Sequence, residues 1–156
     1  MEPRLNLLAG PVTAQFVKQL VAASKTLAGS TLPTATRHLV NIRASQINGC
    51  SGCVDMHTKE AAHAGEDSTR LHLIAAWRDA TVFTDAERAA LELTEDSTRL
   101  ADGRGVSDEI WENAAKHFDE EQLAALVCTI ALINAFNRGN VMVQQPAGSY
   151  QPGRHP

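Results

Sequence analysis

Apolar residues recur at helical spacing along residues 120–143, and this segment constrains the fold more than any other. Its apolar positions follow one another in steps of three and four residues: Leu123, Leu126, Val127, Ile130, Ile133 and Phe136. That spacing places them near one face of a helix, and Pro146 lies just beyond its expected end. No stretch of the chain shows the sustained alternation of apolar and polar residues that is typical of a strand. The sequence therefore predicts an all-α fold.

Capping and turn residues predict six further helices. These are expected at about residues 13–28, 34–47, 51–64, 68–79, 84–101 and 107–118. Thr13 and Ser107 are candidate N-terminal caps, and Thr84 with Glu87 forms a capping box by type and spacing. Gly65 stands where a helix C-terminal cap belongs. The resulting chain of seven helices is long enough, at 156 residues, to be one domain with a sizeable core.

Charge and hydropathy restrict the classes of partner. The formal net charge of -4 argues against nonspecific binding to nucleic acid and gives no reason to expect an anionic membrane surface as a partner. No apolar run approaches the roughly 20 residues that a membrane-spanning helix needs, and the N-terminus lacks the pattern of a signal peptide. We therefore expect a cytoplasmic protein, in which a close cysteine pair is more often catalytic or metal-binding than structural.

Two of the three cysteines, Cys50 and Cys53, form a C-x-x-C pair that His57 follows four residues later. The pair comes directly after Asn48-Gly49, a turn signal, at the expected start of a helix, whose positive end lowers the pKa of a nearby thiol. His57 lies about one turn beyond Cys53, where it can accept the thiol proton. Two cysteines at this spacing can also close a disulfide once one of them is oxidised. These are the parts of a two-cysteine redox site.

The same residues allow other interpretations. The two cysteines and His57 could be three zinc ligands that await a fourth, such as His63 or His38, or the pair could be inert with His57 on the surface. A c-type haem motif needs histidine directly after the second cysteine, where Val54 stands. A thioredoxin-like site needs a surrounding βαβ pattern, which the sequence does not predict. A redox pair is the leading hypothesis, with zinc as an open alternative.

Four residues outside this motif are also candidates for a structural or functional role. Cys128 lies in the apolar segment and is expected in the core. Asn134 and Asn137 interrupt the apolar face of the same helix, which fits either a hydrogen bond between helices or a subunit or substrate contact. Arg43 could lie near the cysteines and favour a thiolate, or could be a solvated surface residue.

The motif as a whole resembles one known family. Residues 39–58 contain Ser-Gln-Ile-Asn-Gly-Cys followed by the C-x-x-C-x-x-x-H pattern, and they resemble the alkylhydroperoxidase D-like (AhpD-like) branch of the carboxymuconolactone decarboxylase superfamily. Supporting matches lie at residues 76–78, 83–91 and 133–138. The resemblance covers about residues 4–143, the expected core of a single domain over residues 1–156.

The resemblance implies an all-helical fold of six or seven helices that assembles into homo-oligomers, often trimers or hexamers. The tail after this core, residues 144–156, is rich in Gly, Pro and Gln, and we expect it to be mobile or packed on another subunit.

The resemblance also implies a function, that of a thiol-dependent alkylhydroperoxidase. Members with the cysteine pair act as peroxidases or disulfide reductases and use no metal or haem. By similarity, Cys53 is the thiol that attacks the hydroperoxide, Cys50 resolves the oxidised intermediate, and His57 belongs to the proton relay. The lipoyl group of a partner protein, or another external dithiol, is the expected reductant. Members that decarboxylate a lactone lack the cysteines, so the intact pair argues against that branch.

The sequence departs from the family pattern at two positions. The relay of the family usually includes a glutamate twelve residues before the first cysteine, where this chain has His38, and some members have a histidine between the cysteines, where this chain has Gly52. A charged His38 would repel a protonated His57, although a neutral His38 could orient it through a hydrogen bond. We therefore expect thiol redox chemistry with an altered relay; the alternative is a redox-sensing or binding protein with little turnover.

Overall fold

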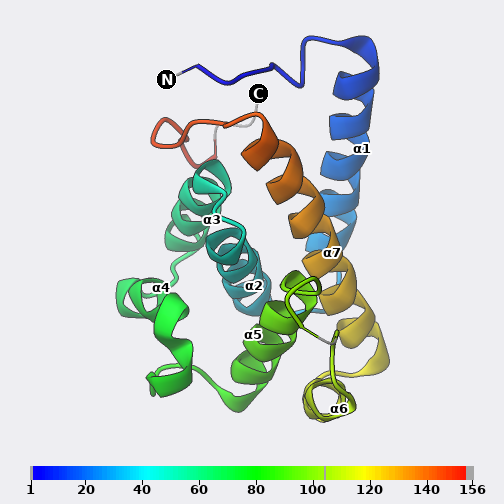
Figure 1. Ribbon diagram of the computed structural model, residues 1–156. Helices are drawn as coiled ribbons and strands as arrows, with labels where there is room; N and C mark the ends of the chain where they lie inside the picture. Colours follow the sequence, from blue (N-terminus) through cyan, green and yellow to red (C-terminus); the bar gives the residue numbers. More distant parts are fainter. Residues whose placement is uncertain (1, 104, 154–156) are drawn as a thin grey trace.

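The computed structural model, which describes residues 2–103 and 105–153, is all-α (Figure 1). Over those residues it contains seven α-helices, one 3-10 helix and no strand, which confirms the predicted fold class. The elements are α1 (Pro11–Ala28), α2 (Thr34–Ile47), α3 (Ser51–His63), α4 (Ser68–Leu73), the 3-10 helix η1 (Ile74–Asp79), α5 (Asp85–Thr98), α6 (Asp108–Ala115) and α7 (Glu120–Met142).

Local capping sets most of the helix ends as predicted. The Thr84 hydroxyl accepts a hydrogen bond from the Glu87 backbone N–H at 3.2 Å, and the Glu87 carboxylate accepts from the Thr84 N–H at 2.8 Å. Ser107 caps α6 through its hydroxyl. Gly65 has a φ of +93° directly after α3, a conformation that glycine adopts without steric cost. These ends were predictable because each depends on residues within one turn.

Four predictions of helix extent were wrong. Helix α1 begins at Pro11 rather than after Thr13, because a proline at the first helical position has a suitable φ and lacks only an N–H that the helix does not use. The segment 68–79 is not one α-helix: Ala76 has non-helical angles, and the second half is the 3-10 helix η1. Helices α5 and α6 end at Thr98 and Ala115, each three residues earlier than expected.

Helix α2 lies at the centre of the fold and contributes to two apolar clusters. Its Val40 packs in a cluster with residues of α5, α6 and α7, including Leu93 and Leu126. Its Leu39 and Ile42 pack on the opposite side, in a cluster with residues of α3, η1 and α5. Burial on both sides fixes α2 between α3 and α7 (Figure 1). The C-terminal end of α2, which leads into the cysteine motif, is therefore held rigidly.

The buried carboxylate of Glu95 on α5 forms hydrogen bonds with residues of α2 and η1. Glu95 accepts hydrogen bonds from Arg43 Nε at 2.7 Å, from Trp77 Nε1 at 2.9 Å and from the Arg78 guanidinium. Burial raises the pKa of Glu95, but these three donors outweigh burial and hold the pKa below its ordinary value. Arg43 is therefore neither a solvated residue nor a partner of the cysteines; it joins α2 to α5.

The described part of the segment after α7, residues 144–153, folds back over α3 of its own chain. Residues 154–156 of the expected tail lie outside the described residues, and the expected mobility or subunit contact of the tail stays a prediction. The Gly148 N–H donates to Asp55 Oδ2 at 2.8 Å, and Lys59 Nζ donates to the Tyr150 carbonyl at 3.0 Å. The Tyr150 hydroxyl donates to the Glu60 carboxylate. We call residues 144–153 the C-terminal strap. In Figure 1 it lies beside the upper end of α3.

The outer helices leave apolar side chains on the surface. Helix α1 contributes no fully buried residue, and Val12 and Phe16 are 79% and 60% exposed. Cys128, which we predicted in the core, is also exposed on α7. The prediction failed because α7 carries apolar residues around much of its circumference, so its sequence does not reveal which face the core covers.

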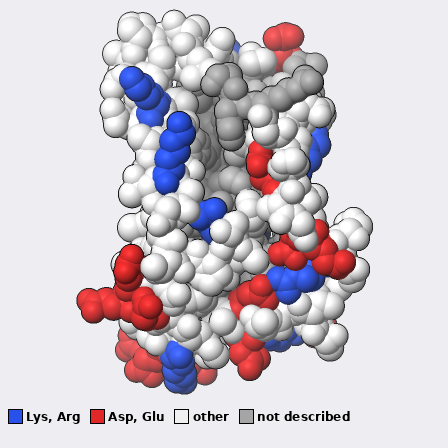
Figure 2. Space-filling model, turned by 180° about the vertical axis from the view of Figure 1, so that it is seen from behind, with Lys and Arg blue, Asp and Glu red and all other residues white. Residues whose placement is uncertain are grey.

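Charges on the surface are mixed. On the face drawn in Figure 2, Lys and Arg side chains stand apart from one another, with acidic side chains among them over the lower half. Of the helices that the structure describes, none is both long enough and apolar enough to cross a membrane.

Candidate active site

The cysteine pair lies at the junction between α2 and α3. Gly49, with a φ of +67°, makes the turn between the helices, and Cys50 is the residue that caps the N-terminus of α3. Cys53 follows in the first turn. The two cysteines form a disulfide with their Cα atoms 5.3 Å apart, and each residue is 2% exposed. The structure thus places the pair at a helix N-terminus, as the sequence predicted, and in a geometry that permits reversible oxidation.

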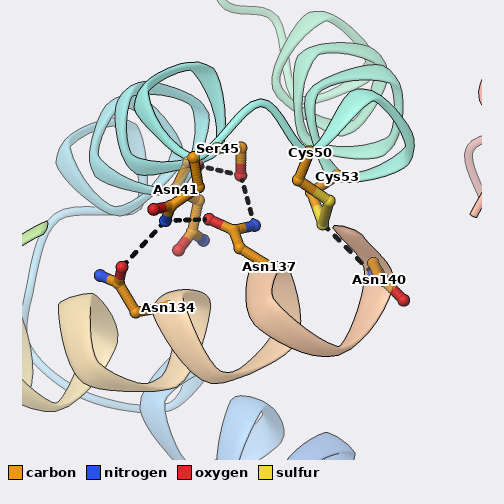
Figure 3. The surroundings of a disulfide bond; sticks show 8 residues. Asn41, Ser45, Cys50, Cys53, Asn134, Asn137 and Asn140 are labelled. Carbon is orange, nitrogen blue, oxygen red and sulfur yellow. Dashed lines mark hydrogen bonds between the residues drawn. A yellow bond between two sulfur atoms is a disulfide. The ribbon is translucent and has the colours of Figure 1, made fainter. Parts of the chain in front are cut away.

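A network of amides from α7 holds this junction in place (Figure 3). Asn48 Nδ2 donates to Asn134 Oδ1 and Asn137 Oδ1, both at 2.9 Å. Asn137, which is fully buried, donates through Nδ2 to the hydroxyl of Ser45 at 3.0 Å. Of the two interpretations of Asn134 and Asn137, hydrogen bonding between helices is therefore the one that the structure supports. Their role is to fix the cysteine junction against α7.

A third asparagine on the same helix touches the sulfur itself. Asn140 Nδ2 donates to Cys53 Sγ at 3.3 Å, and Figure 3 shows its side chain directed at the disulfide. A donor at this position would stabilise a thiolate on Cys53 when the disulfide opens. Sequence reasoning missed Asn140. The signal was present in the three-residue spacing of Asn134, Asn137 and Asn140, which places all three toward one side of α7.

A pocket of about 550 Å³ opens beside the disulfide. Its walls come from the junction, the end of α7 and the C-terminal strap: Gly49, Cys50, Ser51, Asn140, Val141, Gln144, Gln145, Pro146 and Ala147. None of these residues carries a charge. Cys50 is among the residues that line this pocket, and Cys53 is not.

His57 is partly buried on α3, one turn beyond Cys53. Burial lowers the pKa of His57 to about 4, the neighbouring His38 acts in the same direction, and the carboxylate of Glu60 opposes both. The imidazole is therefore neutral at pH 7 and has a nitrogen free to accept a proton. This is the protonation state that a base for the Cys53 thiol requires.

His38 lies on α2 close enough to His57 for their charges to interact. Burial and the charge of Arg37 lower the pKa of His38, whereas Glu60 and Glu66 raise it. Its Nδ1 atom is buried and has no hydrogen-bond partner. The structure thus brings His38 and His57 together, but it gives His38 Nδ1 no contact through which it could orient a second group.

In the described part of the chain, the candidate metal ligands are not gathered around one point in space. Across residues 2–103 and 105–153, no group of three or more His, Cys, Asp or Glu side chains is placed to hold a metal ion. His63, one of the suggested zinc ligands, is exposed on the last turn of α3. The zinc interpretation of the C-x-x-C-x-x-x-H pattern therefore has no fourth ligand in this arrangement.

Gly52 lies where the C-terminal strap crosses the cysteine motif. A Cβ atom at this position would stand 3.4 Å from the Pro146 carbonyl oxygen and 3.5 Å from Gln145 Cγ. A methyl group at this position would thus be in ordinary van der Waals contact with the strap. A longer side chain between the cysteines, such as the histidine that the family resemblance implies for some members, would extend from a Cβ atom that already contacts residues 145 and 146.

Three comparisons relate this geometry to known proteins. The model of the carboxymuconolactone decarboxylase family matches residues 13–96. The uncharacterized protein YdfG of Bacillus subtilis is 36% identical over 138 residues, which cover 88% of this chain and 93% of YdfG. The crystal structure of ATU0492 from Agrobacterium tumefaciens, a protein of unknown function provisionally called the antioxidant defence protein AhpD, superposes with a TM-score of 0.88. Its identity is 32%, and the match covers 96% of this chain and 100% of that one.

A more distant structure shares only the fold. The debrominase Bmp8 in its apo form superposes with a TM-score of 0.81 at 17% identity, covering 92% of this chain and 76% of that one. One helical architecture of this kind therefore occurs in proteins that are named for different reactions.

Proposed function

Because this chain belongs to the carboxymuconolactone decarboxylase family and has an AhpD-like helical fold, we propose that it is a thiol-dependent hydroperoxide reductase. The observation that carries the proposal is the Cys50–Cys53 disulfide at a helix N-terminus, beside a pocket and a neutral histidine. Each part has a counterpart in the chemistry of a two-cysteine peroxidase.

The oxidative half of the cycle begins at Cys53. With His57 as the acceptor of its proton, the Cys53 thiolate attacks the distal oxygen of the hydroperoxide. The O–O bond breaks, the sulfur becomes a sulfenic acid, and the leaving alkoxide takes a proton to become an alcohol. The Cys50 thiol then condenses with the sulfenic acid, which releases water and forms the disulfide. Hydroperoxide and two thiols thus give alcohol, water and a disulfide.

The reductive half begins at Cys50. A thiolate of an external dithiol attacks the sulfur of Cys50, a residue that lines the pocket, and Cys53 leaves as a thiolate. The hydrogen bond from Asn140 Nδ2 to Cys53 Sγ would stabilise this leaving thiolate. The second thiol of the reductant then displaces Cys50 and closes a disulfide of its own. We propose a lipoyl group on a partner protein as this dithiol.

The pocket lining and the exposed side chains of α1 support proposals about the substrate and the oligomeric state. The uncharged lining of the pocket supports a neutral organic hydroperoxide as substrate, because a charged one would lose hydration without gaining a partner. We further propose that the protein works in the cytoplasm as a homo-oligomer, a trimer or a hexamer, in which exposed apolar side chains of α1 are covered.

The proposal is tested by following the consumption of cumene hydroperoxide with dihydrolipoamide as reductant. Cys53→Ser should abolish turnover, whereas Cys50→Ser should give a single oxidation that stops at a sulfenic acid or mixed disulfide. Cys128→Ser is the matched control, because Cys128 is an exposed thiol outside the site, and it should retain the native rate. Full activity in Cys53→Ser would contradict the assignment.

A redox sensor is the second candidate, and the unpartnered Nδ1 of His38 favours it. A sensor would be oxidised once by hydroperoxide and would need no rapid reduction. The same assay separates the two functions: repeated turnover with dihydrolipoamide supports the enzyme, whereas one equivalent of hydroperoxide consumed per chain supports the sensor.

A further inference from the structure

The carboxylate of Glu60 lies near His57, although residue 38 is a histidine rather than the glutamate of the family pattern. Glu60 follows His57 by three residues on α3, so the two side chains lie on adjoining positions of one helix face. The Tyr150 hydroxyl of the C-terminal strap donates a hydrogen bond to Glu60 Oε1. Chain segments about ninety residues apart thus meet beside the proposed base.

Glu60 differs from the other carboxylates of this region in having no basic partner. Glu66, which also faces His38, is bound by Arg70 Nε at 2.7 Å. Lys59, the neighbour of Glu60, is engaged by Asp55 at 2.7 Å and by two carbonyls of the strap. Among the side chains that the structure describes, no Lys or Arg lies within ion-pair distance of Glu60. Its charge is therefore available to the histidines.

We propose that Glu60, held in place by Tyr150, supplies the negative charge at His57 that His38 does not, and so acts as a positioning residue of the thiol-activating relay. This inference rests on the proposed function for its biological meaning. When His57 accepts the proton of Cys53, an imidazolium forms in a partly buried site, and a carboxylate on the same helix face stabilises it. No electrons move in this step; only the thiol proton changes place.

The charged groups around His57 are consistent with this role. From α2, His38 and Arg37 disfavour the protonated imidazole, whereas Glu60 on α3 favours it. Burial and the adjacent Glu60 carboxylate raise the pKa of Tyr150 to about 12, so its hydroxyl keeps its proton and remains a donor to Glu60. Glu60 thus opposes the effects of His38 and Arg37 on the protonation of His57.

The test measures the acidity of the Cys53 thiol directly, with no need for peroxidase activity. In a Cys50→Ser/Cys128→Ser background, Cys53 is the sole cysteine of the chain. The rate of its alkylation by iodoacetamide between pH 5 and 10 reports the thiolate fraction. Glu60→Gln should move the midpoint about one unit higher and slow alkylation about tenfold at pH 7, with little change at pH 10. Tyr150→Phe should move the midpoint in the same direction by a smaller amount.

Asp55→Asn is the control for loss of a carboxylate from α3, because it removes the Asp55 contacts with Gly148 and Lys59 but leaves the charge of Glu60. It should leave the midpoint unchanged. The inference is overturned if Glu60→Gln keeps the native midpoint, or if Asp55→Asn shifts it as far as Glu60→Gln does. If Glu60→Gln does not fold, the midpoints of Tyr150→Phe and Asp55→Asn are compared instead. The inference then requires a higher midpoint in Tyr150→Phe and an unchanged one in Asp55→Asn. If the native protein shows no peroxidase activity but Glu60→Gln still shifts the midpoint of Cys53 alkylation, the proposed function is refuted and the inference about Glu60 stands.

Discussion

At the scale of single residues, His57 has the most unusual environment in the site. Burial lowers its pKa from 6.5 to about 4. The sequence predicted a base at this position from its spacing to Cys53 alone. It could not predict that the base is neutral, because burial and the charges of His38 and Arg37 depend on how α2 packs against α3.

This shift predicts a pH dependence of stability. Between pH 6.5 and 4 the unfolded chain binds a proton at His57 that the folded chain does not, so the free energy of unfolding should decrease as pH falls through this window, by at most about 3 kcal/mol. The full contribution is present above pH 6.5. Urea unfolding of the oxidised protein at pH 7 and pH 4.5 measures it.

His57→Asn is the control for this prediction. The variant should show a smaller loss of stability between pH 7 and 4.5, because asparagine does not titrate. The carboxylates Glu87 and Glu95, whose pKa values are lowered by their hydrogen bonds despite burial, contribute only below their ordinary value of 4.5. An equal loss in the variant and the native protein would show that other groups cause the pH dependence.

At the scale of elements, an element could be predicted from the sequence when the contacts that fix it join residues close together in the chain. The start of α5 was predictable because its capping box lies within four residues. The position of the C-terminal strap was not, because it depends on contacts of Gly148 and Tyr150 with side chains about ninety residues earlier in the chain. The site divides in the same way: the Cys50–Cys53 pair is local in sequence, whereas Asn140 comes from a distant helix.

The close approach of the strap to Gly52 leads to a prediction about this element. Gly52→His should displace residues 145–146, because the imidazole needs the space that they occupy, at a cost of about 1–3 kcal/mol. The Gly148 N–H, which donates to Asp55, should then exchange with solvent at least about tenfold faster. Hydrogen exchange read by NMR or mass spectrometry measures this change.

Ala62→His is the control for the strap prediction, because Ala62 is exposed elsewhere on α3. It should leave the exchange of the strap unchanged. Native protection of Gly148 in Gly52→His would mean that the strap has room for a side chain, and that the glycine has another explanation.

At the scale of the whole molecule, α1 presents apolar side chains on the surface of the single chain. Val12 and Phe16 are largely exposed, and Val21 is 41% exposed on the same helix. The sequence predicted a helix here but could not show that the core of the chain leaves its apolar side chains exposed. Among the described helices, α1 packs mainly against α7, which leaves its outer face exposed.

The oligomer that we propose can be tested at this surface. Phe16→Asp should shift the mass in solution from a trimer or hexamer toward the monomer of 16.8 kDa, because it would place a charge in an apolar contact. Light scattering coupled to gel filtration measures the mass. Lys116→Asp, at an exposed position directly after α6, should leave it unchanged. A monomeric native protein would refute the oligomer.

The C-terminal strap has a practical consequence for how the chain is handled. A protein cut after Val143 would keep all seven helices and both apolar clusters, yet it would lose one wall of the pocket and the Tyr150 hydroxyl at Glu60. We therefore expect that the chain up to Val143 can fold, but that activity also requires residues 144–153. Affinity tags belong at the amino end, and a fusion at the carboxyl end needs a linker that leaves residues 144–153 free to close over α3.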